Sequence, residues 1–527
     1  MHKFTDRRAS LSLLRRHVLA ALVAGAGTVA FSPAVFAMAP KDTLVIGKPA
    51  DPQTLDPAIT IDNNDWTVTY PAYQRLMRYK QVDGKGSTEV EGDLAQSWKA
   101  SPDNLTWTFK LRPGQKFADG ATVDANAVKF SFDRLMKLKQ GPSEAFPPHL
   151  QVTAVDPMTV QFKMEEPFAP FLYTLANDGA SIVNPDVAKR GGDIKAYLSG
   201  HTAGSGPYRL VSWQKGQSLT LEPNPHYGGS HKPHLRKVVV KIVPEASSRR
   251  LQLQKGDLDV AEELPVDQLA ALKKAPGVKV AEFPSLRVTY LYLNNKKGPL
   301  ANVHLRRAVV DAIDYKGIID GIMLKQARQT RGPIPQGMWG YDANLPMPAQ
   351  NLKKAKEELA ASGEGHPTLV LRYSTQDPNW EPIALTAQAN LAAIGVKVKL
   401  EKLANATLRE NLDKGNFDIS VGNWSPDFAD PYMFTSYWFD SSKGGLAGNR
   451  SFYSNPQVDT WLRKAATLSD QSQRVALYTK VQEQVTRDAA YVYLYQKNYQ
   501  AGMRKDVKGF VFNPMLERVF NVADMTK

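Results

Sequence analysis

The 527-residue chain contains no cysteine, which excludes disulfide bonds, thiolate metal ligands and a cysteine nucleophile. Histidine is also scarce, with nine residues, and none of them lies in a recognisable zinc or nucleophile motif. The G-x-S-x-G, H-E-x-x-H and P-loop patterns are missing as well. We therefore expect a protein that is not an enzyme and that needs no metal or cofactor.

A concentrated basic surface is a further feature that the sequence lacks. The formal net charge is +14, and removing the net +4 of residues 1–37 leaves +10. The lysines and arginines are scattered, without a basic run interleaved with aromatic residues, so we expect no nucleic-acid binding. Hydrophobic residues make up 43%, enough for a large core, and the length predicts at least two lobes.

The N-terminus has the pattern of an export signal. Residues 7–16 carry four arginines, residues 18–31 are apolar apart from small residues and Thr28, and Val35-Phe36-Ala37 fits a small-x-small cleavage site. We predict a signal peptide over residues 1–37, cleaved near Ala37, and a periplasmic protein. An uncleaved anchor is the alternative, but the apolar stretch is short and ends at Pro33. Sec and twin-arginine export both stay open.

Periodicity indicates a mixed α/β chain. Residues 105–111 alternate apolar and polar side chains, which is typical of a half-buried strand. Asn351 is a plausible helix N-cap, with Gly363 as the stop. Further along, the pattern predicts strands at 369–373, 396–400 and 417–421, separated by helices at 381–394 and 407–412. This order predicts a parallel sheet.

Ligands of open α/β sheets bind beyond the carboxyl ends of the strands. The residues that follow Val421 are Gly422-Asn423-Trp424-Ser425-Pro426-Asp427. A carboxylate at this position, beside a tryptophan, suits a cationic ligand group, because it supplies the counter-charge while the indole adds an apolar wall. The alternative is a turn-capping aspartate beside a core tryptophan.

Three other segments are weaker candidates. Asn63-Asn64-Asp65-Trp66 precedes an apparent helix that includes Tyr70, Tyr73 and Leu76, and either ligand contact by Asn64 and Trp66 or helix capping explains it. Gly204-Ser205-Gly206-Pro207 resembles a phosphate loop loosely, but Pro207 lacks an N–H, which favours a turn. A third segment contains His226, His231 and His234, which we interpret as a solvated loop rather than a metal site.

Several motifs in a fixed order resemble family 5 extracellular solute-binding proteins, the dipeptide-, oligopeptide- and nickel-binding group. They are Asp93-Leu94-Ala95-Gln96-Ser97-Trp98, residues 105–114, Lys116-Phe117-Ala118-Asp119-Gly120, Gly204-Ser205-Gly206-Pro207-Tyr208, Leu293-Asn294-Asn295, Arg306-Arg307-Ala308, Ala312-Ile313-Asp314, Gly332-Pro333-Ile334-Pro335 and Asn423-Trp424-Ser425-Pro426-Asp427. Ala118 departs from the pattern, since the family commonly has histidine there. The resemblance spreads over about 480 residues.

The resemblance implies a periplasmic binding protein-like α/β fold with two lobes, a hinge and an extra inserted domain. The expected partition is lobe I over residues 38–82, 205–294 and 500–527, inserted domain II over 83–204, and lobe II (domain III) over 295–499. Hinges are expected near residues 293–295 and 496–501.

The resemblance also implies roles for single residues. Asp427 would pair with the α-ammonium of a peptide, Trp424 would line the pocket, and the backbone near Asn423 and Ser425 would contact the ligand main chain. Arg331 is a candidate for the ligand carboxylate.

We therefore expect a monomeric receptor that closes around a short peptide and delivers it to an ABC permease in the inner membrane. A nickel or other metal chelate, a sugar or an opine-like solute is the alternative ligand. An enzyme, such as a hydrolase, and a scaffold or chaperone are the other classes considered.

Overall fold

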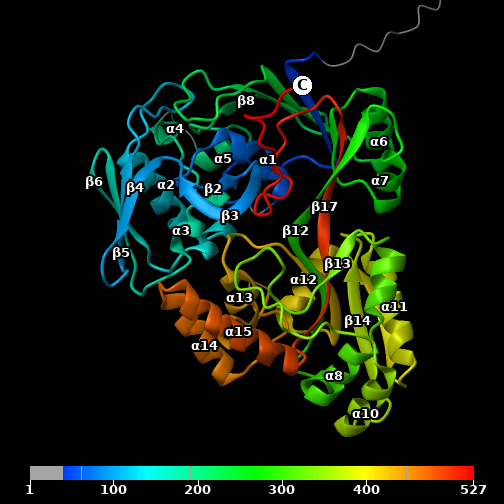
Figure 1. Cartoon of the computed structure of the whole chain (residues 1–527). Helices are drawn as coiled ribbons and strands as arrows, with labels where there is room; N and C mark the ends of the chain where they lie inside the picture. Colours follow the sequence, from blue (N-terminus) through cyan, green and yellow to red (C-terminus); the bar gives the residue numbers. More distant parts are fainter. Residues whose placement is uncertain (1–39, 61, 190–192, 447) are drawn as a thin grey trace, which may run out of the picture. The chain divides into compact units, whose positions relative to one another are not determined.

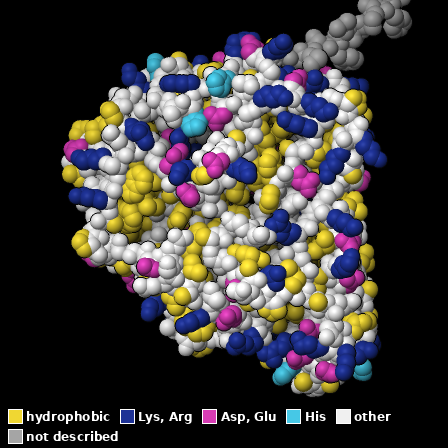
Figure 2. Space-filling model, viewed as in Figure 1, with side chains coloured by type: hydrophobic (Ala, Val, Ile, Leu, Met, Phe, Trp, Pro, Cys, Tyr) yellow, Lys and Arg dark blue, Asp and Glu magenta, His cyan; other side chains and the backbone are white. Residues whose placement is uncertain are grey.

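A computed structural model describes residues 40–60, 62–189, 193–446 and 448–527 (Figure 1). The predicted signal peptide, residues 1–37 with its cleavage site at Ala37, lies outside the described residues. Within the described ranges, no helix combines the length and the apolar character that a bilayer crossing requires. On the face shown in Figure 2, Lys and Arg side chains are interspersed with Asp and Glu side chains rather than gathered into one stripe.

The C-terminal half contains the predicted strand–helix alternation. Its elements are β14 (Thr368–Ser374), α11 (Trp380–Ala392), β15 (Lys397–Leu403), α12 (Asn405–Lys414) and β16 (Ile419–Trp424). β14 pairs in parallel with both β15 and β16, which confirms the predicted parallel sheet. The carboxyl ends of the three strands therefore point to the same edge of the sheet.

Helix α10 (Leu352–Ser362) begins and ends where its capping residues predict. The Asn351 side chain accepts a hydrogen bond from the Lys354 N–H at 3.0 Å. Gly363 adopts a left-handed conformation with φ 73°, which glycine reaches without a steric penalty. Helix α8 (Val303–Ala312) buries Leu305 and Val309 at helical spacing.

These strands belong to one large sheet. Its order is β15, β14, β16, β12 (Val278–Leu293), β17 (Tyr491–Arg504), β11 (Val260–Ala261), β1 (Thr43–Lys48), β10 (Lys237–Ile242), β9 (Ser218–Pro223) and β8 (Tyr208–Gln214), and β13 (Ala327–Gln329) pairs with β17. The long antiparallel strands β12 and β17 run side by side between the two halves of this sheet (Figure 1).

The β12–β17 ladder is interrupted near its middle. Pro284 pairs with Asn498, pairing resumes at Val288 opposite Gln496, and a second register shift follows between Thr289 and Tyr290. The residues of β12 that follow this irregularity pair with β16 as well as with β17. The residues that precede it lie beside the half of the sheet that contains β1. The irregularity therefore marks the crossing between the two halves.

A second, four-stranded antiparallel sheet lies in the predicted insertion. Its order is β4 (Ala95–Ala100), β5 (Thr106–Leu111), β7 (Thr159–Lys163) and β6 (Gln151–Asp156), and helix α2 (Ala125–Leu138) packs against it. Phe132 of α2 meets Phe162 of β7 edge to face, with ring centroids 4.9 Å apart. The predicted strand at 105–111 is confirmed as β5, which buries Phe109 and Leu111.

The predicted boundary between residues 82 and 83 falls in a hairpin turn, because β2 (Met77–Val82) pairs with β3 (Lys85–Gly92). The remaining helices are α1 (Asn63–Ala72), α3 (Phe171–Thr174), α4 (Asp186–Lys189), α5 (Ile194–Leu198), α6 (Ala246–Lys255), α7 (Val266–Leu272), α9 (Tyr315–Gly317), α13 (Ser436–Phe439), α14 (Pro456–Thr467) and α15 (Gln471–Arg487).

Helix α1 corrects one prediction. Residues 63–66 do not precede the helix but form its first turn, because the Asp62 side chain accepts a hydrogen bond from the Asn64 N–H at 2.7 Å and caps the helix there. Tyr73 is the C-cap in an extended conformation and Leu76 lies beyond the helix. Pro71 also removes one N–H from the last turn.

The Gly204-Ser205-Gly206-Pro207 segment passes against the end of α1. The Gly206 N–H donates to the Ala72 carbonyl at 3.0 Å. A Cβ atom on Gly206 would lie 2.4 Å from the Pro71 carbonyl oxygen, so the backbones approach more closely than any side chain allows. The close packing of the two backbones therefore explains this glycine, and no phosphate-binding role is needed to account for it.

We predict that Gly206→Ala destabilises the protein by about 1–3 kcal/mol, the usual cost of overpacking a tight contact. Gly200→Ala is the matched control, because a Cβ atom there would meet nothing within 4 Å. Thermal unfolding should show a lowered Tm for the first variant alone. An equal Tm for the two variants would contradict this account of the contact.

Candidate functional site

A cavity of about 680 Å³ lies along the middle of the large sheet, and its size suits a small solute. Its walls come from both halves of the sheet. They include the start of α1, the segment from β11 to α7, parts of β12 and β17, the loop after β14, helix α12, the end of β16 and residues 514–518.

Strand β16 brings most of the predicted site residues to this cavity. Ile419 and Val421 are buried in the sheet, and Val421 is the first residue of β16 that lines the cavity. Asn423, Trp424, Ser425 and Asp427 all line the cavity. They lie at or just beyond the carboxyl end of a parallel strand, where the sheet topology predicts a ligand.

Asp427 is half-buried, and among the described residues no hydrogen bond or ion pair reaches its carboxylate. Its backbone carbonyl accepts a hydrogen bond from Asn177 Nδ2 at 2.8 Å. The turn-capping alternative is not supported, since the nearby capping aspartate is Asp430, which accepts from the Tyr432 N–H. Asp427 is thus an acid without a structural partner among the residues that the structure describes.

Burial raises the pKa of Asp427 to about 7, and the negative charge of Glu144 acts in the same direction. The positive charge of Arg450 opposes the shift. Near neutral pH the carboxylate is therefore only partly ionised in the ligand-free protein. A bound cation would lower this pKa and complete the ionisation.

Trp424 forms an aromatic wall beside this carboxylate. Its indole stacks on Tyr437, with ring centroids 5.0 Å apart and an interplanar angle of 25°. The Arg450 guanidinium lies 5.3 Å from the indole centroid, in the range of a cation–π contact. The indole is half-buried rather than enclosed in the core, and its buried Nε1 has no hydrogen-bond partner in the described structure.

Ser425 links the two halves of the sheet. Its hydroxyl accepts a hydrogen bond from Arg287 Nε at 3.3 Å and lies 3.5 Å from Glu517 Oε2. Arg287 also forms an ion pair with Glu517 at 3.3 Å. Arg287 lies in the irregular part of β12, and Glu517 comes from the C-terminal segment, so this cluster spans the cavity wall.

The other predicted site residues do not all line the cavity. Trp66 lines the cavity, and its buried Nε1 has no partner among the described residues. Asn64 and Arg331 do not line it. Arg331 instead donates from Nη1 to the Leu345 carbonyl at 2.7 Å, which anchors its guanidinium elsewhere.

Sequence reasoning missed the arginines of the lining, among them Arg409 on α12 and Arg450 in the loop before α14. Arg450 donates to the Tyr292 hydroxyl at 2.9 Å and to the Leu446 carbonyl at 2.8 Å. Neither residue belongs to a motif, because Arg409 has the pattern of an ordinary surface position of a helix and Arg450 lies in a loop.

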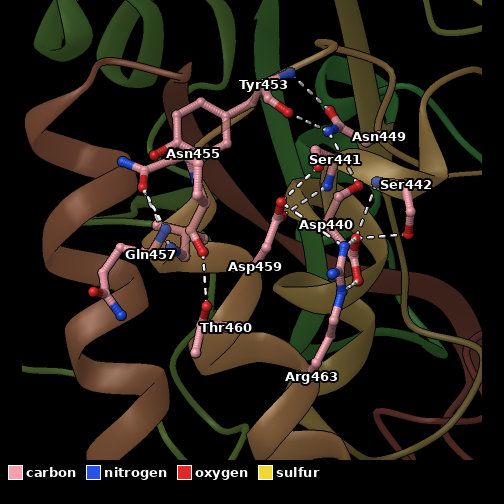
Figure 3. A network of polar contacts seen from close by, with 12 residues as sticks. Asp440, Ser441, Ser442, Asn449, Tyr453, Asn455, Gln457, Asp459, Thr460 and Arg463 are labelled. Atoms are coloured by element: carbon pink, nitrogen blue, oxygen red, sulfur yellow. Dashed lines mark hydrogen bonds and ion pairs between the residues drawn. The ribbon is translucent and has the colours of Figure 1, made fainter.

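A polar network fixes the loop that carries Arg450 (Figure 3). Asp459 of α14 accepts from the Ser441 N–H at 2.9 Å and from its hydroxyl at 2.6 Å. Asp440 forms an ion pair with Arg463 at 3.0 Å. The buried Asn449, next to Arg450, donates to the Tyr453 carbonyl at 2.7 Å. The contacts of Asp440 and Ser441 hold the start of the loop against α14, and the Asn449 bond fixes the backbone next to Arg450.

The remaining candidates do not form a site. His231 pairs with Asp524, with Nδ1 and Oδ1 2.7 Å apart. Within the described ranges, no group of three or more His, Asp or Glu side chains is arranged to hold a metal ion.

Comparisons with known proteins agree with this geometry. The profile of bacterial extracellular solute-binding proteins, family 5 Middle, matches residues 89–445. The probable D,D-dipeptide-binding periplasmic protein DdpA of Escherichia coli (strain K12) is 60% identical over 497 residues, which cover 94% of this chain and 96% of DdpA. The dipeptide-binding protein of the same organism is 29% identical, over 90% of this chain and 92% of its own.

A solved structure shows the same architecture. The periplasmic binding protein DppA from Helicobacter pylori, in complex with the peptide STSA, is 30% identical and superposes with a TM-score of 0.77 over 91% of this chain and 98% of its own. The predicted two-lobe α/β fold of periplasmic binding proteins is therefore confirmed.

We predict that Asp427→Asn stabilises the ligand-free protein. The pKa of this group is raised from 3.8 to about 7, so the folded state binds more protons than the unfolded state between these values. Stability is therefore lost as the pH rises through this window. Thermal unfolding should show a Tm gain of about 2–4 °C at pH 8 for the variant, narrowing as the pH falls towards 4. A variant less stable than the parent at pH 8 would refute this.

Proposed function

Because the chain belongs to the bacterial extracellular solute-binding proteins of family 5, we propose that it is the periplasmic receptor of an ABC importer for short peptides. It captures the peptide in the cavity at the end of β16 and delivers it to a permease in the inner membrane. The observation that carries this proposal is Asp427, a carboxylate that faces the cavity without a partner among the described residues.

An α-ammonium group is the ligand chemistry that Asp427 suits best. A carboxylate held away from water is costly unless a positive charge and N–H donors compensate it. A primary ammonium supplies both in one group, and charge-assisted hydrogen bonds are stronger than neutral ones. Trp424 and Trp66 would then provide apolar walls for the rest of the peptide.

Arg450 is our candidate for the ligand α-carboxylate, in place of Arg331. Its charge acts on Asp427, so both groups serve the same end of the cavity. Its guanidinium is oriented by Tyr292 and by the loop of Figure 3. A dipeptide is short enough to present an ammonium and a carboxylate to two groups placed in this way.

The name of one relative guides the choice of ligand stereochemistry to test. The protein with 60% identity is named a probable D,D-dipeptide-binding protein. We propose D,D-dipeptides as the first ligands to test, with their L,L counterparts beside them. This choice is favoured over a metal chelate, a sugar or an opine-like solute, because Asp427 selects an ammonium group.

Closure of two lobes around the ligand is the proposed mechanism. The expected partition at residues 82, 204, 294 and 499 is adjusted in it, because the boundary at 82 lies in the β2–β3 hairpin and β12 crosses between the halves of the sheet at residues 284–288. We place the hinge at the irregularity of β12 between Pro284 and Val288, opposite Gln496. Residues 293–295 are less suitable, since the buried Asn294 donates to the carbonyls of Gly415 and Phe417 within one half of the sheet. Ligand contacts from both halves would favour the closed state.

A binding role without catalysis is part of the proposal. The named relatives are solute-binding transport proteins. The lining contains an acid and arginines suited to holding a zwitterion, and we assign no bond-breaking step to them.

Calorimetry with D-Ala-D-Ala and L-Ala-L-Ala tests the function. We expect one-to-one binding of at least one of them, and a loss of about tenfold or more in affinity for Asp427→Asn. Wild-type affinity should fall as the pH drops from about 7.5 to 5.5, because protonation of Asp427 removes the counter-charge, while the variant stays nearly constant.

Asp267→Asn is the matched control, because Asp267 is an exposed acid of the same lining. The affinity of the Asp267→Asn variant for the dipeptide should stay within about threefold of the wild-type affinity. Equal affinities for the wild type and Asp427→Asn would overturn the ammonium assignment.

A further inference from the structure

Arg409 is a cation that faces the cavity without an anion. It lies on α12, whose Leu408 and Leu412 also belong to the lining. Among the described residues, no hydrogen bond or ion pair reaches its guanidinium. Partial burial and the like charge of Arg450 both lower the pKa of Arg409. Both effects mean that the surroundings destabilise the charged form, and an added anion would relieve this.

Apart from Arg450, the other basic residues of the lining have an acidic partner. Arg287 forms an ion pair with Glu517, and Arg518 forms one with Glu263. Lys497 lies 3.8 Å from Asp377. Their charges are therefore compensated within the protein.

The charge balance at the Trp424 end of the cavity is unequal. Within the lining, two guanidinium groups, Arg409 and Arg450, stand against one unpaired carboxylate, Asp427, while Glu144, whose charge also acts on Asp427, is an exposed acid outside the lining. Asp267, an exposed acid of the lining, belongs to α7, which packs against β12 and β17 rather than beside α12. A zwitterionic dipeptide brings no net charge and leaves one positive charge uncompensated. A dipeptide with an acidic side chain brings the missing negative charge.

Resting on the proposed function, we propose that Arg409 forms an anion subsite beside Arg450 and that the cavity prefers dipeptides with a side-chain carboxylate. Arg450 then faces the α-carboxylate, and Arg409 faces the second carboxylate. Because Arg409 is exposed, the gain in affinity is that of a solvated ion pair and depends on ionic strength.

Matched dipeptides test this inference by calorimetry at low salt. Ala-Glu is compared with Ala-Gln, and Glu-Ala with Gln-Ala, in the D,D and the L,L series, because each pair differs mainly in charge. We expect at least one acidic dipeptide to bind about fivefold more tightly than its amide counterpart, with the ratio shrinking as salt is added.

Arg409→Gln should bring this ratio close to one. Arg209→Gln removes the same charge from β8, outside the cavity lining, and should leave the ratio unchanged. If amide dipeptides bind but no acidic dipeptide binds more tightly than its counterpart, the subsite is refuted while the receptor function stands. If no dipeptide binds at all, the proposed function fails and this inference fails with it.

Discussion

The antiparallel pairing of β12 with β17 is the constraint on which the cavity depends. These two strands stand between the halves of the large sheet, so they fix where the end of β16 meets the residues contributed by the other half. The interruption between Pro284 and Val288 places Arg287 at the crossing, within reach of Ser425 and Glu517. In the proposed closure the lobes bend at this interruption, because continuous pairing would make the joint stiffer.

The binding chemistry consists of interactions that the protein leaves incomplete. Other buried charges have partners within the protein: Arg474 pairs with Asp430 at 2.7 Å, and Arg249 donates to the Glu262 carbonyl. Asp427 lacks such a partner among the described residues, although burial acts against its charge. Arg409 is exposed and also has no ion-pair partner there, and the like charge of Arg450 acts against its charge. A ligand that supplies the opposite charges would complete both interactions.

Sequence patterns predicted the parts of the fold that depend on local physics. Asn351 and Gly363 predicted the ends of α10, and the β14–α11–β15–α12–β16 alternation predicted the sheet edge that carries Asp427. The predicted start of α1 was wrong. Asp62, Asn63 and Asn64 are all good N-cap residues, and the sequence does not say which of them accepts the capping hydrogen bond. Arg409 and Arg450 were missed because their role depends on which charges stay unpaired after tertiary packing, and the sequence alone does not show this.

The most direct test of the central claim is a crystal structure of the protein with a bound dipeptide. We expect the α-ammonium nitrogen to lie about 2.7–3.2 Å from the Asp427 carboxylate, with the indole of Trp424 beside the peptide. A peptide whose ammonium group faces Glu144 or solvent, while Asp427 stays without a partner, would contradict the account.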